Sequence, residues 1–170
     1  NVYHHKYQLN NTYDTMVENL RSTNPLSEAN IKSRLRMITL YNVATMTNGI
    51  VVGTGNKVED FGVGFYTKYG DGGVDISPIA DLYKTEVKEL SKYLGISEEI
   101  INASPSDDLY NDSRTDESVI GATYEELEWA MEYSTEEITE RQKEVLEIYR
   151  DRNHKNQHKM LPIPIYKLKN

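Results

Sequence analysis

No cysteine occurs among the 170 residues, which excludes a disulfide scaffold, a thiolate zinc site and a thiol nucleophile. The chain also lacks any apolar run close to the roughly 18–20 residues that a membrane-crossing helix needs. Its first six residues are polar and have none of the apolar core of a secretory signal. We therefore expect a cytoplasmic protein that does not bind a membrane.

Positive charge is scarce. The sequence has 19 Lys and Arg against 27 Asp and Glu, which gives a formal net charge of -8. Binding to nucleic acid needs clustered Lys and Arg that neutralise backbone phosphates, so we expect no nucleic-acid partner. A small ligand that carries phosphate needs only a local basic pocket, and this charge balance does not exclude it.

The region around residue 50 predicts an α/β architecture. Apolar residues recur at helical spacing from Ile31 to Ile38, and Asn48-Gly49 provides a stop signal. Three β-branched residues and a glycine follow at 50–53 and predict a short strand buried on both faces. A helix, a tight turn and a buried strand in succession are typical of an α/β fold.

The remaining chain predicts mainly helices. We expect a short strand at 7–9, helices at 13–20, 83–94, 97–102 and 134–150, a helix opened by a capping box at Thr123, and an extended tail with Pro162 and Pro164. One buried strand is too few for a parallel sheet covered on both faces. Because residue 1 is Asn rather than Met, we expect residues 1–170 to be the C-terminal part of a single longer domain.

The first candidate site segment, residues 52–59, directly follows the predicted strand. Ligands of open α/β sheets bind at the carboxyl ends of strands, and glycines let the backbone approach a phosphate. Thr54 offers a hydroxyl and Glu59 offers a carboxylate for a metal. The spacing matches neither the P-loop nor the dinucleotide fingerprint, and a glycine turn after a strand is more often only a turn. This segment alone does not decide between the two readings.

The second candidate, residues 64–75, combines aromatic side chains with one lysine and two aspartates among glycines. An aromatic face can stack on a ring, Lys68 can neutralise a phosphate, and Asp75 can accept hydrogen bonds from a ribose or an amide. The alternative is a structural loop with aromatics in the core, while a calcium loop fails on spacing. The number of side chains in this segment that could contact a ligand favours the prediction of a binding loop.

Isolated cations are weaker signals. Arg36, Lys84 and the tail pairs His154-Lys155 and His158-Lys159 would by default be solvated. A zinc site is disfavoured because the chain has four His and no Cys.

Taken in order and spacing, the motifs resemble those of the ammonia-dependent NAD synthetases, from about residue 31 to the tail. The resemblance is carried by Ser33-Arg34-Leu35-Arg36-Met37, Gly53-Thr54-Gly55-Asn56-Lys57, residues 65–75, Pro78, residues 81–85, Pro105-Ser106, Thr115-Asp116-Glu117 and His158-Lys159.

This resemblance implies a fold and an activity. The family belongs to the ATP pyrophosphatases, which have a doubly wound parallel sheet of the adenine nucleotide alpha-hydrolase type and form homodimers. It implies adenylation of the nicotinate carboxylate of deamido-NAD by ATP with Mg²⁺, followed by displacement of AMP by ammonia to give NAD. In general terms, the mixed anhydride turns a poor electrophile into one with a good leaving group, and the protein supplies positioning and charge neutralisation.

The resemblance also implies residue roles, none of them covalent catalysis. It places Thr54, Lys84 and Ser106 at ATP, Glu59 at Mg²⁺, and Arg36, Lys68, Asp75, His158 and Lys159 at deamido-NAD. Ser106 stands where the family usually has Thr, and its hydroxyl keeps the role. The second His-Lys pair is preferred over His154-Lys155 because a proline-containing segment follows it.

One family motif is absent. Ser-Gly-Gly-x-Asp-Ser, which cradles pyrophosphate, does not occur in the 170 residues, and we expect it upstream. Without it, these residues alone should be inactive. Two alternatives stay open: another ATP pyrophosphatase, against which the acidic charge and absent Cys count if it modifies tRNA, and a non-catalytic nucleotide-binding module. The sequence does not settle whether ammonia or glutamine supplies the nitrogen.

Overall fold

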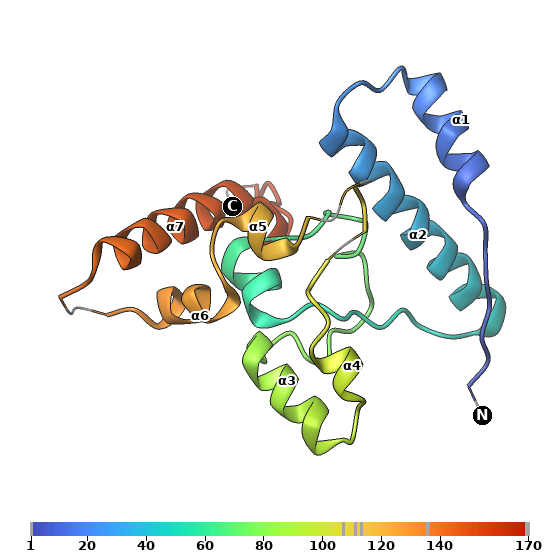
Figure 1. Ribbon diagram of the computed structural model, residues 1–170. Coiled ribbons are helices and arrows are strands. Elements are labelled where there is room, and N and C mark those ends of the chain that lie inside the picture. The colour runs from blue at the N-terminus through green and yellow to red at the C-terminus, as the bar shows by residue number, and fades with distance from the viewer. Residues whose placement is uncertain (1, 107, 111, 113, 135–136, 169–170) are drawn as a thin grey trace.

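The computed structural model describes residues 2–106, 108–110, 112, 114–134 and 137–168 (Figure 1). Its helices are α1 (Asn10–Leu20), α2 (Pro25–Thr47), the π-helix η1 (Val58–Val63), α3 (Lys84–Tyr93), α4 (Glu98–Ile101), α5 (Asp116–Ile120), α6 (Tyr124–Glu132) and α7 (Glu140–Met160). Helices α1 and α2 lie side by side at one end of the molecule, and α6 and α7 lie together at the other (Figure 1). The glycine-rich segment 53–75 runs between them.

Helix α2 begins and ends at local signals in the sequence. The side chain of Asn24 accepts a hydrogen bond from the Ser27 amide at 3.1 Å, and Pro25 occupies the first helical position. At the other end Asn48 adopts the left-handed conformation, with φ of 53°, which confirms the predicted stop.

The predicted strand at 50–53 is reduced to one parallel bridge between Val52 and Ile76, the only strand pairing among the residues described. Val51 is buried, but Ile50 and Val52 are 60% and 51% exposed. The prediction of burial on both faces is therefore wrong for this chain, because β-branched composition shows strand preference and not which neighbours cover it. Residues 7–9, predicted as a strand, have no regular structure.

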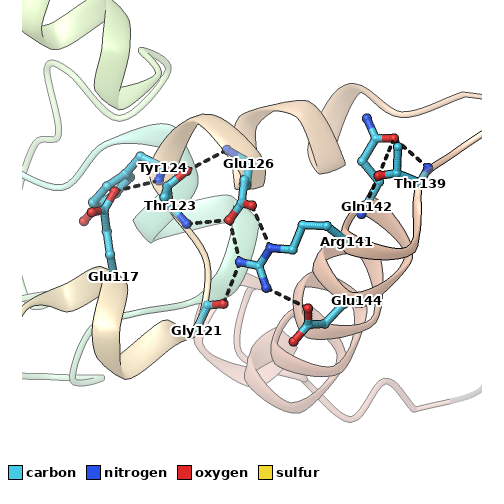
Figure 2. Close-up of polar contacts among 9 residues, drawn as sticks. All are labelled: Glu117, Gly121, Thr123, Tyr124, Glu126, Thr139, Arg141, Gln142 and Glu144. Atoms are coloured by element: carbon cyan, nitrogen blue, oxygen red, sulfur yellow. Dashed lines mark hydrogen bonds and ion pairs between the residues drawn. The ribbon is translucent and has the colours of Figure 1, made fainter.

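The core lies between η1, α6 and α7. Its buried members are Val58, Val63, Ile120, Ala122, Tyr124, Leu127, Ala130, Val145 and Leu146. Helix α6 starts at the predicted capping box, in which Thr123 and Glu126 exchange side chain to backbone hydrogen bonds at 3.2 and 3.0 Å (Figure 2). The prediction of this helix start is confirmed.

Arg141 joins α7 to α6. Its guanidinium donates two hydrogen bonds to the carboxylate of Glu126, both at 2.7 Å, and others to Glu144 and to the carbonyl of Gly121 (Figure 2). The Arg141 bonds hold the pKa of Glu126 below its usual range. The fork geometry suits a bidentate carboxylate contact.

We expect Arg141→Ala to lower the free energy of unfolding at neutral pH, and the loss to shrink on acidification. A carboxyl with a depressed folded pKa stabilises above its ordinary pKa, and this contribution disappears as the pH falls through the folded value. Chemical denaturation at several pH values measures the difference. Lys143→Ala, which removes an exposed pair with Glu140, is the control and should change little. A pH-independent loss would contradict this account.

Helix α7 differs from the predicted helix at 134–150 at both ends, and residues 135 and 136 of that prediction lie outside the described residues. It begins after Thr139, whose side chain and that of Gln142 form a second capping box, and it continues to Met160. Residues 151–160 carry no apolar periodicity that would extend the prediction. These last turns are held in place by the side chains of Asn153, Asn156 and Lys159, which donate hydrogen bonds to backbone carbonyls of residues 62–66. Within the described chain, no helix is both long and apolar enough to cross a membrane.

Candidate nucleotide-binding site

A cleft of about 1050 Å³ lies between α2, the glycine-rich segment, the start of α3 and the last turns of α7. This volume suits a nucleotide-sized ligand. All the predicted site residues except Asp75 line it, namely Arg36, Thr54, Glu59, Lys68, Lys84, Ser106, His158 and Lys159. Residues up to 123 positions apart in the sequence (36 to 159) therefore meet at one cavity.

Glu59 and Lys84 form a partly buried pair in this cleft. The ammonium Nζ of Lys84 lies 3.3 Å from Oε1 of Glu59, and the side chains are 24% and 16% exposed. The backbone amide of Asn56 donates to Oε2 of Glu59 at 3.2 Å. Asn56, itself buried, uses its side chain to accept from the amides of Val58 and Glu59, so it fixes the start of η1. The carboxylate is thus held in a defined place.

Tyr124 is a site residue that the sequence did not reveal. Its buried hydroxyl donates to Oε1 of Glu59 at 2.6 Å and lies 3.5 Å from Oδ2 of Asp116. Burial, followed by the charge of Glu59, raises the pKa of this phenol, so it stays a hydrogen-bond donor. The Lys84 ammonium lies 4.9 Å from the ring centroid. In the sequence, Tyr124 looked like an ordinary first-turn residue of α6.

The donor set of the cleft fits Mg²⁺ held largely by its ligand. Among the residues described, no group of three or more His, Cys, Asp or Glu side chains could hold a metal. Mg²⁺ commonly binds through one or two carboxylates, several waters and the phosphates of a substrate. Glu59 faces the cleft and Asp116 lines it nearby, which matches that mode of binding.

On the wall of the cleft formed by residues 64–68 and the end of α7, two lysines bond to backbone carbonyls. Lys159 donates to the carbonyls of Gly64 and Tyr66 at 2.8 and 2.7 Å, and burial lowers the pKa of its ammonium. Lys68 donates to the carbonyl of His158. Both side chains line the cleft, so they can meet an anionic ligand by exchanging these partners.

Asp75 does not line the cleft, although its neighbour Val74 and its bonding partner Val51 do. Its carboxylate accepts from the Val51 amide at 2.7 Å and from the Tyr41 hydroxyl at 3.2 Å, which connects α2 to the segment before Thr54. It is the one predicted site residue that does not line the cleft. Thr54 and Ser106 do line it, and the Ser106 hydroxyl also accepts from the amide of Asp108 at 3.3 Å.

A third group, Ser33 and Asp71, holds the turn at 67–71 against α2. The Ser33 hydroxyl donates to Oδ1 of Asp71 at 2.6 Å and accepts from the Asp71 amide at 2.9 Å. The same Oδ1 accepts from the amide of Thr67 at 3.0 Å. Gly70 has to be small here, because a Cβ would lie 2.2 Å from the Ser33 hydroxyl. Both polar residues occur in the sequence motifs, but the pairing between them was not predicted.

Gly55 makes room for the half-buried carboxylate of Asp60. A Cβ at Gly55 would lie 2.3 Å from Oδ1 of Asp60. Burial, with the charges of Glu59 and Asp71, raises the pKa of Asp60 to about 6. This carboxylate borders a second, smaller cavity of about 160 Å³ beside the main cleft.

We expect Gly55→Ala to lower the free energy of unfolding by about 1–3 kcal/mol, since the added methyl would overlap the Asp60 carboxylate and force it to move. Urea denaturation measures this cost. The same substitution in an Asp60→Ala background should cost clearly less, because the atoms in the way are gone. Equal costs in both backgrounds would show that Asp60 is not the obstacle.

The glycine loop, the carboxylate beside a lysine and the basic residues at the end of α7 define a candidate site for a phosphate-bearing ligand. The family model described as NAD synthase matches residues 1–163, so the chain belongs to the NAD synthase family.

Curated relatives carry the same family name. The NH3-dependent NAD+ synthetase of Methanococcoides burtonii is 47% identical over 116 residues, which cover 68% of this chain and 43% of the relative. That of Alkaliphilus metalliredigens is 42% identical over 139 residues, covering 82% of this chain and 54% of the relative. The chain therefore spans about half the length of these relatives.

Two solved structures resemble the fold. NMN synthetase from Francisella tularensis gives a TM-score of 0.88 at 30% identity and covers 98% of this chain and 68% of that chain. The NH3-dependent NAD synthetase from Campylobacter jejuni, in complex with nitrate, gives 0.71 at 27% identity and covers 94% of this chain and 64% of that chain. The fold of this chain is therefore similar to that of these two synthetases.

Proposed function

We propose that the protein containing this chain catalyses the ATP-dependent amidation of deamido-NAD by ammonia. The nicotinate carboxylate attacks the α-phosphorus of ATP, the bond to the pyrophosphate oxygen breaks, and pyrophosphate leaves. Ammonia then attacks the acyl carbon, AMP leaves with the electron pair of the broken bond, and the nitrogen loses its surplus proton. The products are NAD, AMP and pyrophosphate.

One observation carries this proposal. Eight side chains that the family resemblance implies meet in one cleft, with the Glu59–Lys84 pair on one wall and Lys68, His158 and Lys159 on the other. We propose that Thr54, Lys84 and Ser106 bind ATP and that Mg²⁺, held by Glu59 and the phosphates, neutralises their charge.

Deamido-NAD is assigned to the other wall, with Arg36, Lys68, His158 and Lys159 at its phosphates. Asp75 is also proposed to bind deamido-NAD, and its bonds to Val51 and Tyr41 hold it beside the segment before Thr54. Residues 1–170 would form one synthetase domain whose complete form has the doubly wound sheet. A cytoplasmic homodimer is part of the same proposal.

The test is NAD formation from deamido-NAD, ATP, Mg²⁺ and ammonium by the protein as encoded, followed with an NAD-specific dehydrogenase. Turnover that needs all four components is the expected result. Binding of ATP or deamido-NAD without turnover would overturn the proposal in favour of a nucleotide-binding module.

A second substrate is favoured by the similarity to the Francisella tularensis NMN synthetase, whose TM-score of 0.88 exceeds the 0.71 of the Campylobacter jejuni NAD synthetase. Nicotinate mononucleotide carries the same carboxylate and one phosphate, so the same chemistry would give NMN. The ratio of kcat/KM for the two substrates decides between them. A ratio that favours the mononucleotide assigns the protein to NMN synthesis.

A further inference from the structure

Three side chains along one face of α7 donate hydrogen bonds to the backbone at the end of η1. We call Asn153, Asn156 and Lys159 the α7 ladder. The amide of Asn153 donates to the carbonyl of Gly62 at 2.8 Å, and that of Asn156 to the carbonyl of Val63 at 2.8 Å. Their spacing of three residues places them on the same side of the helix, facing residues 61–66.

These bonds satisfy carbonyls that the π-helix leaves unpaired. The last carbonyls of any helix have no partner within the helix, and leaving a buried one without a donor destabilises the fold. Gly62 and Val63 are buried, so water does not replace the missing donors. The α7 ladder supplies donors at this end of η1.

The approach of α7 is close enough to need glycine at position 64. Gly64 ends η1 with φ of 62°, and a Cβ there would lie 2.4 Å from Cβ of Asn156. Any larger residue would push α7 away from the segment. The contact between this turn and Asn156 is therefore built into the backbone of both elements.

The segment that the ladder holds leads directly into one wall of the cleft. Residues 64–68 all line the cleft, and Lys68 donates back to the carbonyl of His158 near the end of α7. Glu59 lies at the other end of η1, where Asn56 and Tyr124 bond to its carboxylate. The two ends of η1 thus depend on different partners.

We propose that Asn153 and Asn156 are positioning residues for the pyridine nucleotide. Through the carbonyls of Gly62 and Val63 they fix residues 64–68, and so Lys68, in the place where this wall binds the substrate. Both side chains bond to the backbone of the wall, and that of Asn156 also borders the cleft. The assignment of this wall to deamido-NAD rests on the proposed function.

Steady-state kinetics of Asn156→Ala in the protein as encoded tests the inference, with Asn153→Ala as a second variant. We expect KM for deamido-NAD to rise about tenfold, equivalent to ~1.4 kcal/mol of binding, with KM for ATP unchanged. Gln157→Ala, an exposed position on the same turn, is the matched control. An unchanged KM for deamido-NAD, or an equal rise in both KM values, would overturn the inference.

The variant Asn156→Asp separates the effect of losing the hydrogen-bond donor from the effect of losing side-chain volume. The carboxylate keeps the shape of the amide but cannot donate to Val63 until it is protonated. Deamido-NAD binding, compared with wild type at each pH, should therefore recover as the pH falls toward the pKa of the new carboxyl. A pH-independent defect would show that the hydrogen bond does not position the wall.

Limited trypsin digestion keeps the test independent of the proposed reaction. Cleavage after Lys68 should be faster in Asn156→Ala than in wild type or Gln157→Ala, because residues 64–68 have lost a restraint. If the wild-type protein forms no NAD, the proposed function fails, and equal cleavage rates would overturn the positioning role separately.

Discussion

Replacing Glu59 with glutamine should lower kcat/KM for amide formation by about 10²- to 10³-fold, the range seen when one preorganised electrostatic contact is removed. The substitution keeps the size of the side chain but removes its charge. Oε1 accepts from Lys84 and Tyr124, and Oε2 accepts from the Asn56 amide. In either orientation of a glutamine amide, its NH2 group would face a hydrogen-bond donor where the carboxylate has an acceptor, so at least one of these bonds would be lost.

Metal dependence gives this prediction a specific readout. If Glu59 contributes to Mg²⁺ binding, the Mg²⁺ concentration for half-maximal rate should rise in the variant, whereas KM for deamido-NAD should change less. Glu89→Gln on the exposed side of α3 is the control and should match wild type. A loss in kcat/KM of less than about threefold would contradict a role for Glu59 in the reaction, including any role through its ion pair with Lys84.

The parts of the fold that the sequence predicted correctly have local causes. The left-handed residue Asn48 and the capping box at Thr123 each bond to residues no more than four positions away, so the local sequence contains the signal for both. The same holds for the order of the motifs around Thr54, Lys68 and Lys84, which were expected to meet and do line one cleft.

What the sequence did not predict depends on contacts between distant segments. Tyr124 and Glu59 are 65 positions apart, and nothing at either position announces their hydrogen bond. The π-helix within 53–75 also escaped prediction, because six residues that include a glycine show no helical period. The carbonyls of Gly62 and Val63 in this π-helix accept hydrogen bonds from Asn153 and Asn156. These two polar residues do not form an apolar pattern, so the sequence did not indicate that their helix packs here.

The exposed side chains of Ile50 and Val52 show that a β-branched sequence pattern does not predict whether a strand is buried. The composition correctly indicated an extended segment, and the amide of Gly53 does bond to the carbonyl of Ile76 at 2.7 Å. Burial, however, is set by whatever packs on the pleat, which no single segment encodes. Asp75 shows the same limit for function, since its place in a motif did not reveal that it bonds to Val51.

Replacing Lys84 with methionine should lower kcat/KM for ATP by about 100-fold, or ~2.7 kcal/mol, and should raise KM for ATP more than KM for deamido-NAD. Lys84 is the first residue of α3, and the next residue, Thr85, donates to Glu128 of α6 through its amide and hydroxyl at 3.1 and 2.7 Å. A cation at a helix N-terminus opposes the helix dipole, so removing it should not destabilise α3. The loss would then report on the site and not on folding.

The dependence of Lys84 on Glu59 makes the prediction sharper. At rest the ammonium lies 3.3 Å from the carboxylate, so each charge offsets the other in a partly buried cleft. Lys84→Met should therefore cost less in kcat/KM when Glu59→Gln is already present than it costs alone. Lys92→Met, exposed at the end of the same helix, is the matched control. Strictly additive losses would mean that the two residues act on ATP independently and that their ion pair has no part in binding it.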